Sequence, residues 1–217
     1  VTNTHTPEKT TATIRKVWSD KDDQDGKRPE SLEVALKKGN QTETTVTLNA
    51  ENNWSATVEN LEKKANGEDI EYYWQEVNVP DGYSVSAPTI NGTVTTLTNT
   101  YAPETTSISV RKVWDDKDNQ DGIRPNKVSV QLYAGNEAKG DPVELNESNK
   151  WSHTWENLDK KAGGQEIQYR VDEVEVPDGY SLTVTNEGTA YTVTNTHTPE
   201  KTTATIRKVW SDKDDQD

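Results

Sequence analysis

The 217-residue sequence contains no cysteine, no methionine and no phenylalanine. Without cysteine there can be no disulfide, no thiolate zinc site and no cysteine nucleophile. No apolar run approaches the roughly 18 residues of a membrane-spanning helix, and no signal peptide opens the sequence. We expect no membrane insertion, and any export or anchoring signal should lie outside this fragment. A secreted chain of small domains would need a covalent staple other than a disulfide.

Basic residues are also fewer than acidic residues. The 24 Lys and Arg residues face 38 Asp and Glu residues, and the net charge of −14 argues against nucleic acid or anionic membranes as partners. Hydrophobic residues make up 29% of the chain and the mean hydropathy is −1.04, which favours two small cores over a single large one. Seven Trp, eight Tyr and many β-branched residues are available to build them, a composition typical of strands.

An internal repeat dominates the sequence. The segment Arg15–Pro29 returns 96 residues later at Arg111–Pro125, and residues 1–25 are identical to residues 193–217. This pattern predicts a window cut from a longer array of domains joined by stiff Pro- and Thr-rich connectors. The predicted parts are the last strand of a truncated upstream repeat (1–5), two complete domains (6–102 and 103–198), and the first strand and loop of a truncated downstream repeat (199–217).

Each repeat contains seven short strand patterns separated by turn signals such as DQDG, PDGY and NG. No segment has a convincing helical period, and LEKKANG is expected to be a solvated turn. Seven strands at this spacing indicate an all-β chain of two tandem β-sandwiches of immunoglobulin-like size. In the first repeat the predicted strands are 11–18, 31–37, 44–48, 54–58, 70–77, 83–86 and 93–101.

The two-residue period of three strands places a lysine, a glutamate and an asparagine on the apolar face of each repeat. The lysine and the asparagine are 83 residues apart in both repeats. The three residues are Lys16, Glu76 and Asn99 in the first repeat, and Lys112, Glu173 and Asn195 in the second.

Three buried polar groups are costly unless they satisfy one another. One interpretation is a structural ion pair between lysine and glutamate with a hydrogen bond to the asparagine. In the other, the desolvated lysine loses its proton and becomes a nucleophile, while a neutral glutamate shuttles protons. The amine then attacks the asparagine amide, ammonia leaves, and a Lys–Asn isopeptide bond forms. The spacing alone leaves both interpretations open.

Several motifs follow one another in a fixed order in the second repeat: RKVW, DDKDNQDG-x-RP, W-x-x-x-W-x-N-L, PDGY and TVTNTH. In order and spacing they resemble the collagen-adhesin B-type (CnaB) repeats of Gram-positive surface adhesins and pilins. The resemblance implies a sandwich of inverse-Ig or transthyretin-like topology. It also implies self-formed isopeptide bonds between first-strand lysine and last-strand asparagine, Lys16 with Asn99 and Lys112 with Asn195, assisted by the catalytic residues Glu76 and Glu173.

The expected function is that of structural stalk repeats in a cell-surface adhesin, where each internal bond gives mechanical and proteolytic resistance. No cofactor and no turnover enzyme activity are expected, because bond formation is autocatalytic and happens once. The expected partners are neighbouring repeats of the same chain, with a host ligand bound by another region. The expected location is the cell-wall-anchored, extracellular surface of a bacterium. The alternative is a ligand-binding adhesin module without a covalent bond, which would need an exposed apolar or aromatic patch.

Weaker signals have ordinary structural explanations. The acidic stretch Asp20–Gly26 departs from the calcium-loop pattern, so a turn paired with Arg28 is favoured over a metal site. His153 shares a strand face with two tryptophans, which favours packing over ligation. The tryptophans predicted to lie in the cores are Trp18, Trp54, Trp74, Trp114, Trp151 and Trp155.

Two residues near the ends, Asn3 and Lys208, have no partner of their own repeat in this sequence. We predict that neither forms an internal isopeptide bond. We expect the end segments to be ordered by strand pairing with neighbouring molecules or by docking on the adjacent domain.

Overall fold

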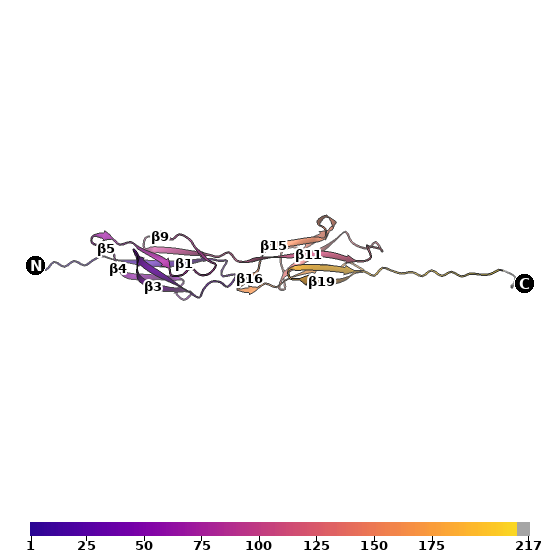
Figure 1. The fold of residues 1–217 in the computed structure, drawn as a ribbon, viewed down its shortest axis with the longest axis horizontal. Coiled ribbons are helices and arrows are strands. Elements are labelled where there is room, and N and C mark those ends of the chain that lie inside the picture. Colours follow the sequence, from indigo (N-terminus) through magenta and orange to yellow (C-terminus); the bar gives the residue numbers. More distant parts are fainter. Residues whose placement is uncertain (212–217) are drawn as a thin grey trace. The chain divides into compact units, whose positions relative to one another are not determined.

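The computed structural model describes residues 1–211 of the chain. They divide into two compact units, Val1–Thr106 with Asn157–Ile167, and Ser107–Glu156 with the described residues from Gln168 onward. Strands make up nearly all of the regular structure, as the sequence predicts (Figure 1). Within the described residues, no helix has the length and apolar character needed to cross a membrane.

The first sandwich consists of two facing sheets. One sheet has the order β4-β1-β10-β8 with β9 also paired to β10, and the other has the order β3-β2-β7. A small hairpin, β5-β6, stands beside them. The strands are β1 (Lys9–Ser19), β2 (Ser31–Lys38), β3 (Gln41–Asn49), β4 (Ser55–Glu62), β5 (Lys64–Ala65), β6 (Glu68–Asp69), β7 (Tyr72–Glu76), β8 (Ser84–Val85), β9 (Thr89–Asn91) and β10 (Val94–Thr100).

The second sandwich repeats this plan. One sheet has the order β15-β11-β20-β19, and in the other β12 pairs with β13, β14 and β18. A single 3-10 turn, η1 (Glu147–Asn149), follows β14. The strands are β11 (Thr105–Asp115), β12 (Lys127–Ala134), β13 (Glu137–Ala138), β14 (Val143–Asn146), β15 (Ser152–Asp159), β18 (Tyr169–Glu173), β19 (Ser181–Glu187) and β20 (Ala190–Thr196). The separate hairpin of β16 (Lys161–Ala162) and β17 (Gln165–Glu166) falls in the segment that groups with the first unit.

Each core lies between its two sheets and is built from alternate residues of the long strands. In the first sandwich Ile14, Leu36 and Leu48 are fully buried, and Trp18 and Trp54 pack against them while remaining partly exposed. Burying one such aliphatic side chain contributes about 1.5–3 kcal/mol. The second core is made by Ile108, Val110, Val128, Val130, Leu132, Leu145, Val171 and Val193.

All seven strands predicted for the first repeat are present, and three further short strands occur. Two of these form a hairpin: β5 lies inside LEKKANG, the segment expected to be a turn, and β6 follows it directly. Asn66 and Gly67 both have positive φ at the centre of this hairpin, which is the conformation of a tight two-residue connection. The turn signal in LEKKANG was therefore correct, but the flanking residues also pair.

The end segments differ from the expectation. Residues 1–8 and the described residues from 197 onward contain no strand (Figure 1). Asn3 and residues 201–211 are exposed, so the expected docking on the adjacent domain is wrong for them. A lone strand gains little stability without partners, and among residues 1–211 no strand pairs with either end segment. Their role as strands of further repeats stays a prediction.

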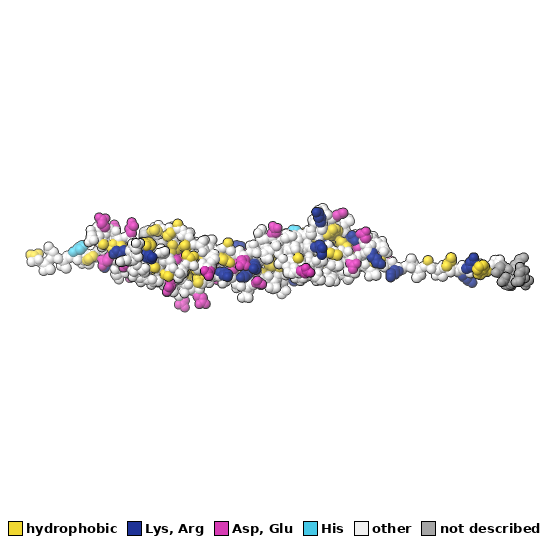
Figure 2. Space-filling view, viewed as in Figure 1, with side chains coloured by type: hydrophobic (Ala, Val, Ile, Leu, Met, Phe, Trp, Pro, Cys, Tyr) yellow, Lys and Arg dark blue, Asp and Glu magenta, His cyan; other side chains and the backbone are white. Residues whose placement is uncertain are grey.

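Acidic side chains stand out over the surface of both sandwiches, with Lys and Arg between them (Figure 2). This distribution agrees with the net charge of −14.

Candidate functional site

The first and last strands of each sandwich lie side by side and run parallel. In the pairing of β1 with β10, Lys16 is opposite Leu97 and Trp18 is opposite Asn99. Residues opposite each other in a parallel pair point to the same side of the sheet, so these four side chains share its inner face. In the pairing of β11 with β20, the corresponding pairs are Lys112 with Val193 and Trp114 with Asn195.

The glutamate comes from the facing sheet. Glu76 ends β7, whose alternation turns Trp74 and Glu76 inward. The Nζ atom of Lys16 lies 3.7 Å from Oε1 of Glu76, and Nδ2 of Asn99 donates a 3.0 Å hydrogen bond to Oε2 of the same carboxylate. The glutamate therefore connects the two sheets through one cluster, which we call the triad.

In the second triad the asparagine again contacts the glutamate, and Nζ of Lys112 donates to the backbone oxygens of Val113 (3.0 Å) and Val193 (3.5 Å). Nδ2 of Asn195 donates a 3.1 Å hydrogen bond to Oε1 of Glu173, which ends β18. Both asparagines are fully buried, and both lysines retain only 4% of their exposure. The structure thus brings together all six residues that the sequence pattern placed on the inner faces.

Burial changes the proton affinity of the triads. It lowers the pKa of Lys16 and of Lys112 from 10.5 to about 8, although the neighbouring glutamate opposes this shift in each case. Burial also raises the pKa of Glu173, against the opposing effects of Lys112 and Asn195. With a pKa near 8, about one lysine in ten is neutral at pH 7, far more than for an exposed lysine.

Several polar atoms of the triads have no hydrogen-bond partner. They include Oε1 of Glu76, Oε2 of Glu173, and Oδ1 of both Asn99 and Asn195. Nζ of Lys16 donates instead to the backbone oxygens of Val17 (2.8 Å) and Leu97 (3.4 Å). A buried polar atom without a partner costs about 1–3 kcal/mol and is rare in folded proteins. Such a cluster is poorly suited to a purely stabilising role.

Chemically, each triad combines a nucleophile, an electrophile and a proton carrier. The lysine provides an amine that burial holds partly neutral, and the asparagine provides an amide carbon. The glutamate touches the amide nitrogen, the atom that must receive a proton before it can leave. The arrangement can therefore support one amide-transfer reaction between side chains.

The repeated sandwiches and triads match a known family. A family model described as the Cna protein B-type domain matches residues 12–100 and 108–196, which is most of the chain. The chain belongs to the Cna protein B-type domain family.

Similar proteins contain tandem B-type domains of the same kind. The collagen adhesin of Staphylococcus aureus is 46% identical over 218 residues, which cover 100% of this chain but only 18% of the adhesin. Crystal structures of one and of two B repeat units of the collagen-binding surface protein of Staphylococcus aureus are 42% and 43% identical. They cover 88% and 90% of this chain and 100% and 51% of their own, with TM-scores of 0.43 and 0.45.

Two of the residues singled out in the sequence lie apart from both triads of the B-type domains. Asn3 is exposed in the N-terminal segment, and Lys208 is exposed in the C-terminal one. Nζ of Lys208 lies 4.5 Å from the ring centroid of Trp210. The prediction that neither residue forms an internal isopeptide bond stays a prediction.

The acidic loop forms a turn with an ion pair, and the histidine packs against a neighbouring ring. Asp20 pairs with Arg28, so the predicted turn with an ion pair is confirmed. Within residues 1–211 no group of three His, Cys, Asp or Glu side chains is arranged to hold a metal ion. His153 packs edge-on against Trp155, with 4.7 Å between the ring centroids.

One part of the site was missed from the sequence. Tyr83 and its counterpart Tyr180 donate hydrogen bonds to the aspartates of the acidic loops, Asp20 and Asp116. The signal was available, because the PDGY motif recurs at the same place in both repeats. Nothing in a strand period, however, links this turn to a loop about 60 residues earlier.

Proposed function

We propose that these B-type domains are stalk repeats of a cell-surface adhesin, and that each forms an internal isopeptide bond. The bonds join Lys16 to Asn99 and Lys112 to Asn195, with Glu76 and Glu173 as the catalytic residues. One observation carries the proposal: the same buried triad recurs in both domains, with its lysine and asparagine on adjacent first and last strands.

The reaction needs no group from outside the chain. The neutral lysine Nζ attacks the asparagine Cγ, the bond from Cγ to Nδ2 breaks, and a new bond from Nζ to Cγ forms. One proton leaves the amine and one nitrogen must gain a proton to depart as ammonia. The glutamate carboxyl, hydrogen-bonded to Nδ2, carries that proton from one nitrogen to the other and ends unchanged. Enforced proximity in the core supplies most of the rate.

A bond at this place has a direct mechanical consequence. Tension along the chain reaches each domain through its first and last strands, which are the strands that the bond joins. The load then passes through covalent bonds and bypasses the rest of the sandwich. The bond also restricts the unfolded chain as a disulfide would, without requiring an oxidising environment.

The proposal extends to place and partners by similarity. The matched relative is named as a collagen adhesin, so we place this chain on the extracellular surface of a bacterial cell, anchored to the wall. The chain spans 18% of that relative, and we assign host-ligand binding to another region of the protein. Neighbouring repeats of the same chain are then the partners of these domains.

The test is the intact mass of the purified chain. Each bond expels one ammonia, so two bonds lower the mass by about 34 Da from the value of the unmodified sequence. Glu76→Ala and Glu173→Ala should each remove half of this deficit, and the double variant should remove all of it. Glu33→Ala is the matched control, because Glu33 is exposed on the outer face of β2 and should leave the deficit intact.

An unmodified mass would contradict the proposal. The triads would then be buried polar clusters without a covalent bond, and the stalk argument would lose its mechanical basis. That result would favour the alternative, a ligand-binding adhesin module.

A further inference from the structure

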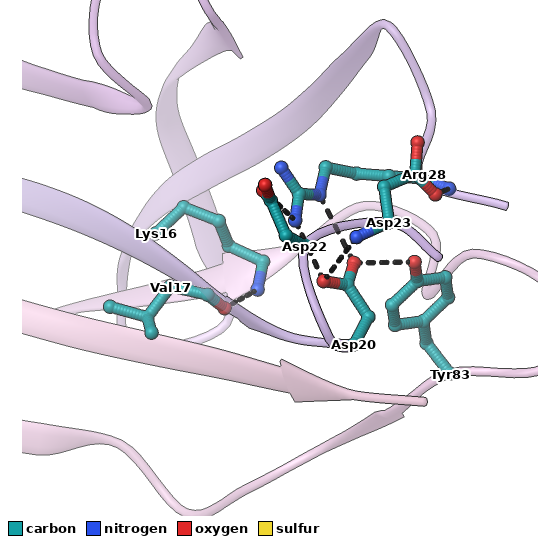
Figure 3. A network of polar contacts seen from close by, with 7 residues as sticks. All are labelled: Lys16, Val17, Asp20, Asp22, Asp23, Arg28 and Tyr83. Carbon is teal, nitrogen blue, oxygen red and sulfur yellow. Dashed lines mark hydrogen bonds and ion pairs between the residues drawn. The ribbon is translucent and has the colours of Figure 1, made fainter. Parts of the chain in front are cut away.

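Four residues after each reactive lysine lies a buried aspartate with an unusually complete set of partners. Asp20 keeps 2% of its exposure. Its Oδ1 accepts hydrogen bonds from Arg28 Nη2 (2.7 Å) and from the backbone N–H of Asp23 (3.1 Å). Its Oδ2 accepts from Arg28 Nε (3.0 Å) and from the Tyr83 hydroxyl (2.8 Å), as Figure 3 shows. Four donors satisfy all the acceptor sites of this carboxylate, so its position is fixed.

The second domain contains the same cluster. Asp116 accepts from Arg124 Nε (2.9 Å), from the Tyr180 hydroxyl (2.9 Å) and from the backbone N–H of Asn119 (2.9 Å). Asn119 stands where the first domain has Asp23, and both use a side-chain oxygen to accept the backbone N–H of the arginine. The hydrogen-bond geometry is therefore the same in both domains, although the accepting side chain is an aspartate in one and an asparagine in the other.

The tyrosine ring of each cluster packs against a tryptophan. The ring of Tyr83 contacts Trp18 edge-to-face, with 5.1 Å between centroids, and Trp54 contacts the same indole at 5.0 Å. In the second domain Trp114 lies 5.1 Å from Tyr180 and 5.4 Å from Trp151. Each indole is therefore held by two aromatic rings, one of which is tied to the aspartate.

The indole in turn forms a wall of the triad. Nζ of Lys16 lies 4.2 Å from the ring centroid of Trp18, and Trp18 is the strand partner of Asn99. The corresponding distance from Lys112 to Trp114 is 4.0 Å. Trp18 is partly exposed whereas Lys16 is buried, so solvent reaches the indole but not the amine packed against it.

We propose that Asp20, Arg28 and Tyr83, and likewise Asp116, Arg124 and Tyr180, are positioning residues for isopeptide formation. They act through Trp18 and Trp114, whose indoles they fix against the reactive amine. This inference rests on the proposed function, and it assigns the acidic loop of each domain a role in the reaction. The cluster works by placement more than by charge, because Asp20 and Arg28 have opposite effects on the pKa of Lys16. Closing the site to water keeps the amine neutral and aimed at the amide.

The test uses Tyr83→Phe in the full chain, which removes one hydroxyl and keeps the ring. The chain is made by cell-free synthesis, and the loss of ammonia is followed by mass spectrometry over time at a series of pH values. Proteolytic peptides assign each loss to its domain, so the second domain acts as a reference within the same molecule. We expect the first domain to react about tenfold more slowly and the second to be unchanged. Tyr180→Phe should give the reciprocal result.

A pH profile separates positioning from plain stabilisation. In the unaltered chain the rate should reach half its maximum near the lysine pKa of about 8. If Tyr83→Phe admits water to the site, this midpoint should move upward, toward the ordinary lysine value of 10.5. Tyr73→Phe is the matched control: its hydroxyl also donates one hydrogen bond, to the Gly39 oxygen, but on the outer surface. That control should keep both the rate and the midpoint.

Each outcome has a separate meaning. Loss of two ammonias at unchanged rate and midpoint in Tyr83→Phe overturns the positioning role and leaves the proposed function standing. No ammonia loss in the unaltered chain overturns the proposed function itself. If Tyr83→Phe does not fold, Arg28→Lys is used, since it keeps the charge but cannot make the paired contact to Asp20. Slowing of the first domain alone in a folded Arg28→Lys chain supports the proposal, and an unchanged rate overturns it.

Discussion

The two domains share their buried chemistry but differ where the chain leaves them. After β10, the carboxylate of Asp25 accepts hydrogen bonds from the Tyr101 hydroxyl (2.9 Å) and the backbone N–H of Glu104 (2.8 Å). After β20, Asp121 is in the same position and accepts from the backbone N–H of Glu200 at 2.9 Å. Its other partner is Nε2 of His197, at 3.0 Å. We call this contact, between the loop aspartate and the segment that follows the last strand, the clasp. Its side-chain partner is a phenol in the first domain and an imidazole in the second.

This difference shows which parts of the repeat tolerate change. The triads match in residue type and in place, as the proposed reaction requires, since its nucleophile, amide and proton carrier could not be exchanged for other side chains. The clasp needs only a donor to a carboxylate, and both tyrosine and histidine provide one. Of the two donors, only the histidine changes its charge near neutral pH. The domains should therefore react alike but respond differently to pH.

The largest expected effect tests whether the triads are equivalent. Glu76→Ala should prevent the bond in the first domain and lower its free energy of unfolding by about 4.5 kcal/mol, the entropy of a closed loop of more than 80 residues. Glu173→Ala should do the same to the second domain. Differential scanning calorimetry should show one transition shifting in each variant while the other stays in place. Unequal shifts would show that the two triads do not stabilise their domains equally. A shift of both transitions in each variant would show that the domains do not unfold independently.

A smaller effect concerns the aspartate clusters. Arg124 in particular holds the pKa of Asp116 far below its usual range, with help from the Asn119 N–H and the Tyr180 hydroxyl. Because the folded-state pKa is depressed, this stabilisation is present above the unfolded value near 3.8 and is lost as pH falls through the folded value.

Asp116→Asn should therefore cost the second domain about 2–3 kcal/mol at neutral pH, since it breaks a buried charged pair. Urea unfolding at neutral and acidic pH checks this, with the first domain as the control. The variant and the original chain should become similar at low pH. A constant difference at all pH values would show that the charge of Asp116 is not what stabilises the loop.

The smallest expected effect is a pH dependence of stability that the histidine clasp should have and the tyrosine clasp should lack. His197 has a raised pKa, because Asp121 accepts from Nε2 and the Gly179 oxygen lies 2.8 Å from Nδ1. Since the folded-state pKa is raised, its contribution is fully present below the unfolded value of 6.5 and is lost as pH rises through the folded value.

Exchanging the histidine and the tyrosine between the clasps should exchange the pH dependence of the two domains' stability. In His197→Tyr the second domain should lose this pH dependence, and in Tyr101→His the first domain should acquire it. Thermal melts at pH values on either side of 6.5 measure both, with the unaltered domain of each chain as its control. The shifts should be small because each exchange alters a single side-chain hydrogen bond. Equal pH dependence of both domains in the unaltered chain would mean that the clasp does not couple to folding.

Strand periodicity was sufficient to find the triads but not their surroundings. Lys16, Glu76 and Asn99 each sit on a regular strand, where alternation alone decides which face a side chain takes. Their roles in bond formation stay a prediction, but their burial could be read from the pattern.

The aspartate cluster could not be found in this way. Asp20 and Arg28 lie in a loop without a period, and Tyr83 reaches them from a turn that is distant in sequence. Three consecutive non-glycine residues of this loop, Lys21, Asp22 and Asp23, have positive φ. Such a backbone is maintained by the contacts of the folded loop, and residue preference does not predict it.

The parallel pairing of β1 with β10 also fixes where the chain enters and leaves a domain. The first strand begins at one end of the sheet and the last strand ends at the other, so the two points are separated by about the length of β1, roughly 35 Å. A domain of this kind needs no return segment to bring the chain back. Duplication of its coding sequence therefore adds one more unit whose entry and exit points are separated in the same way, without any redesign of the fold.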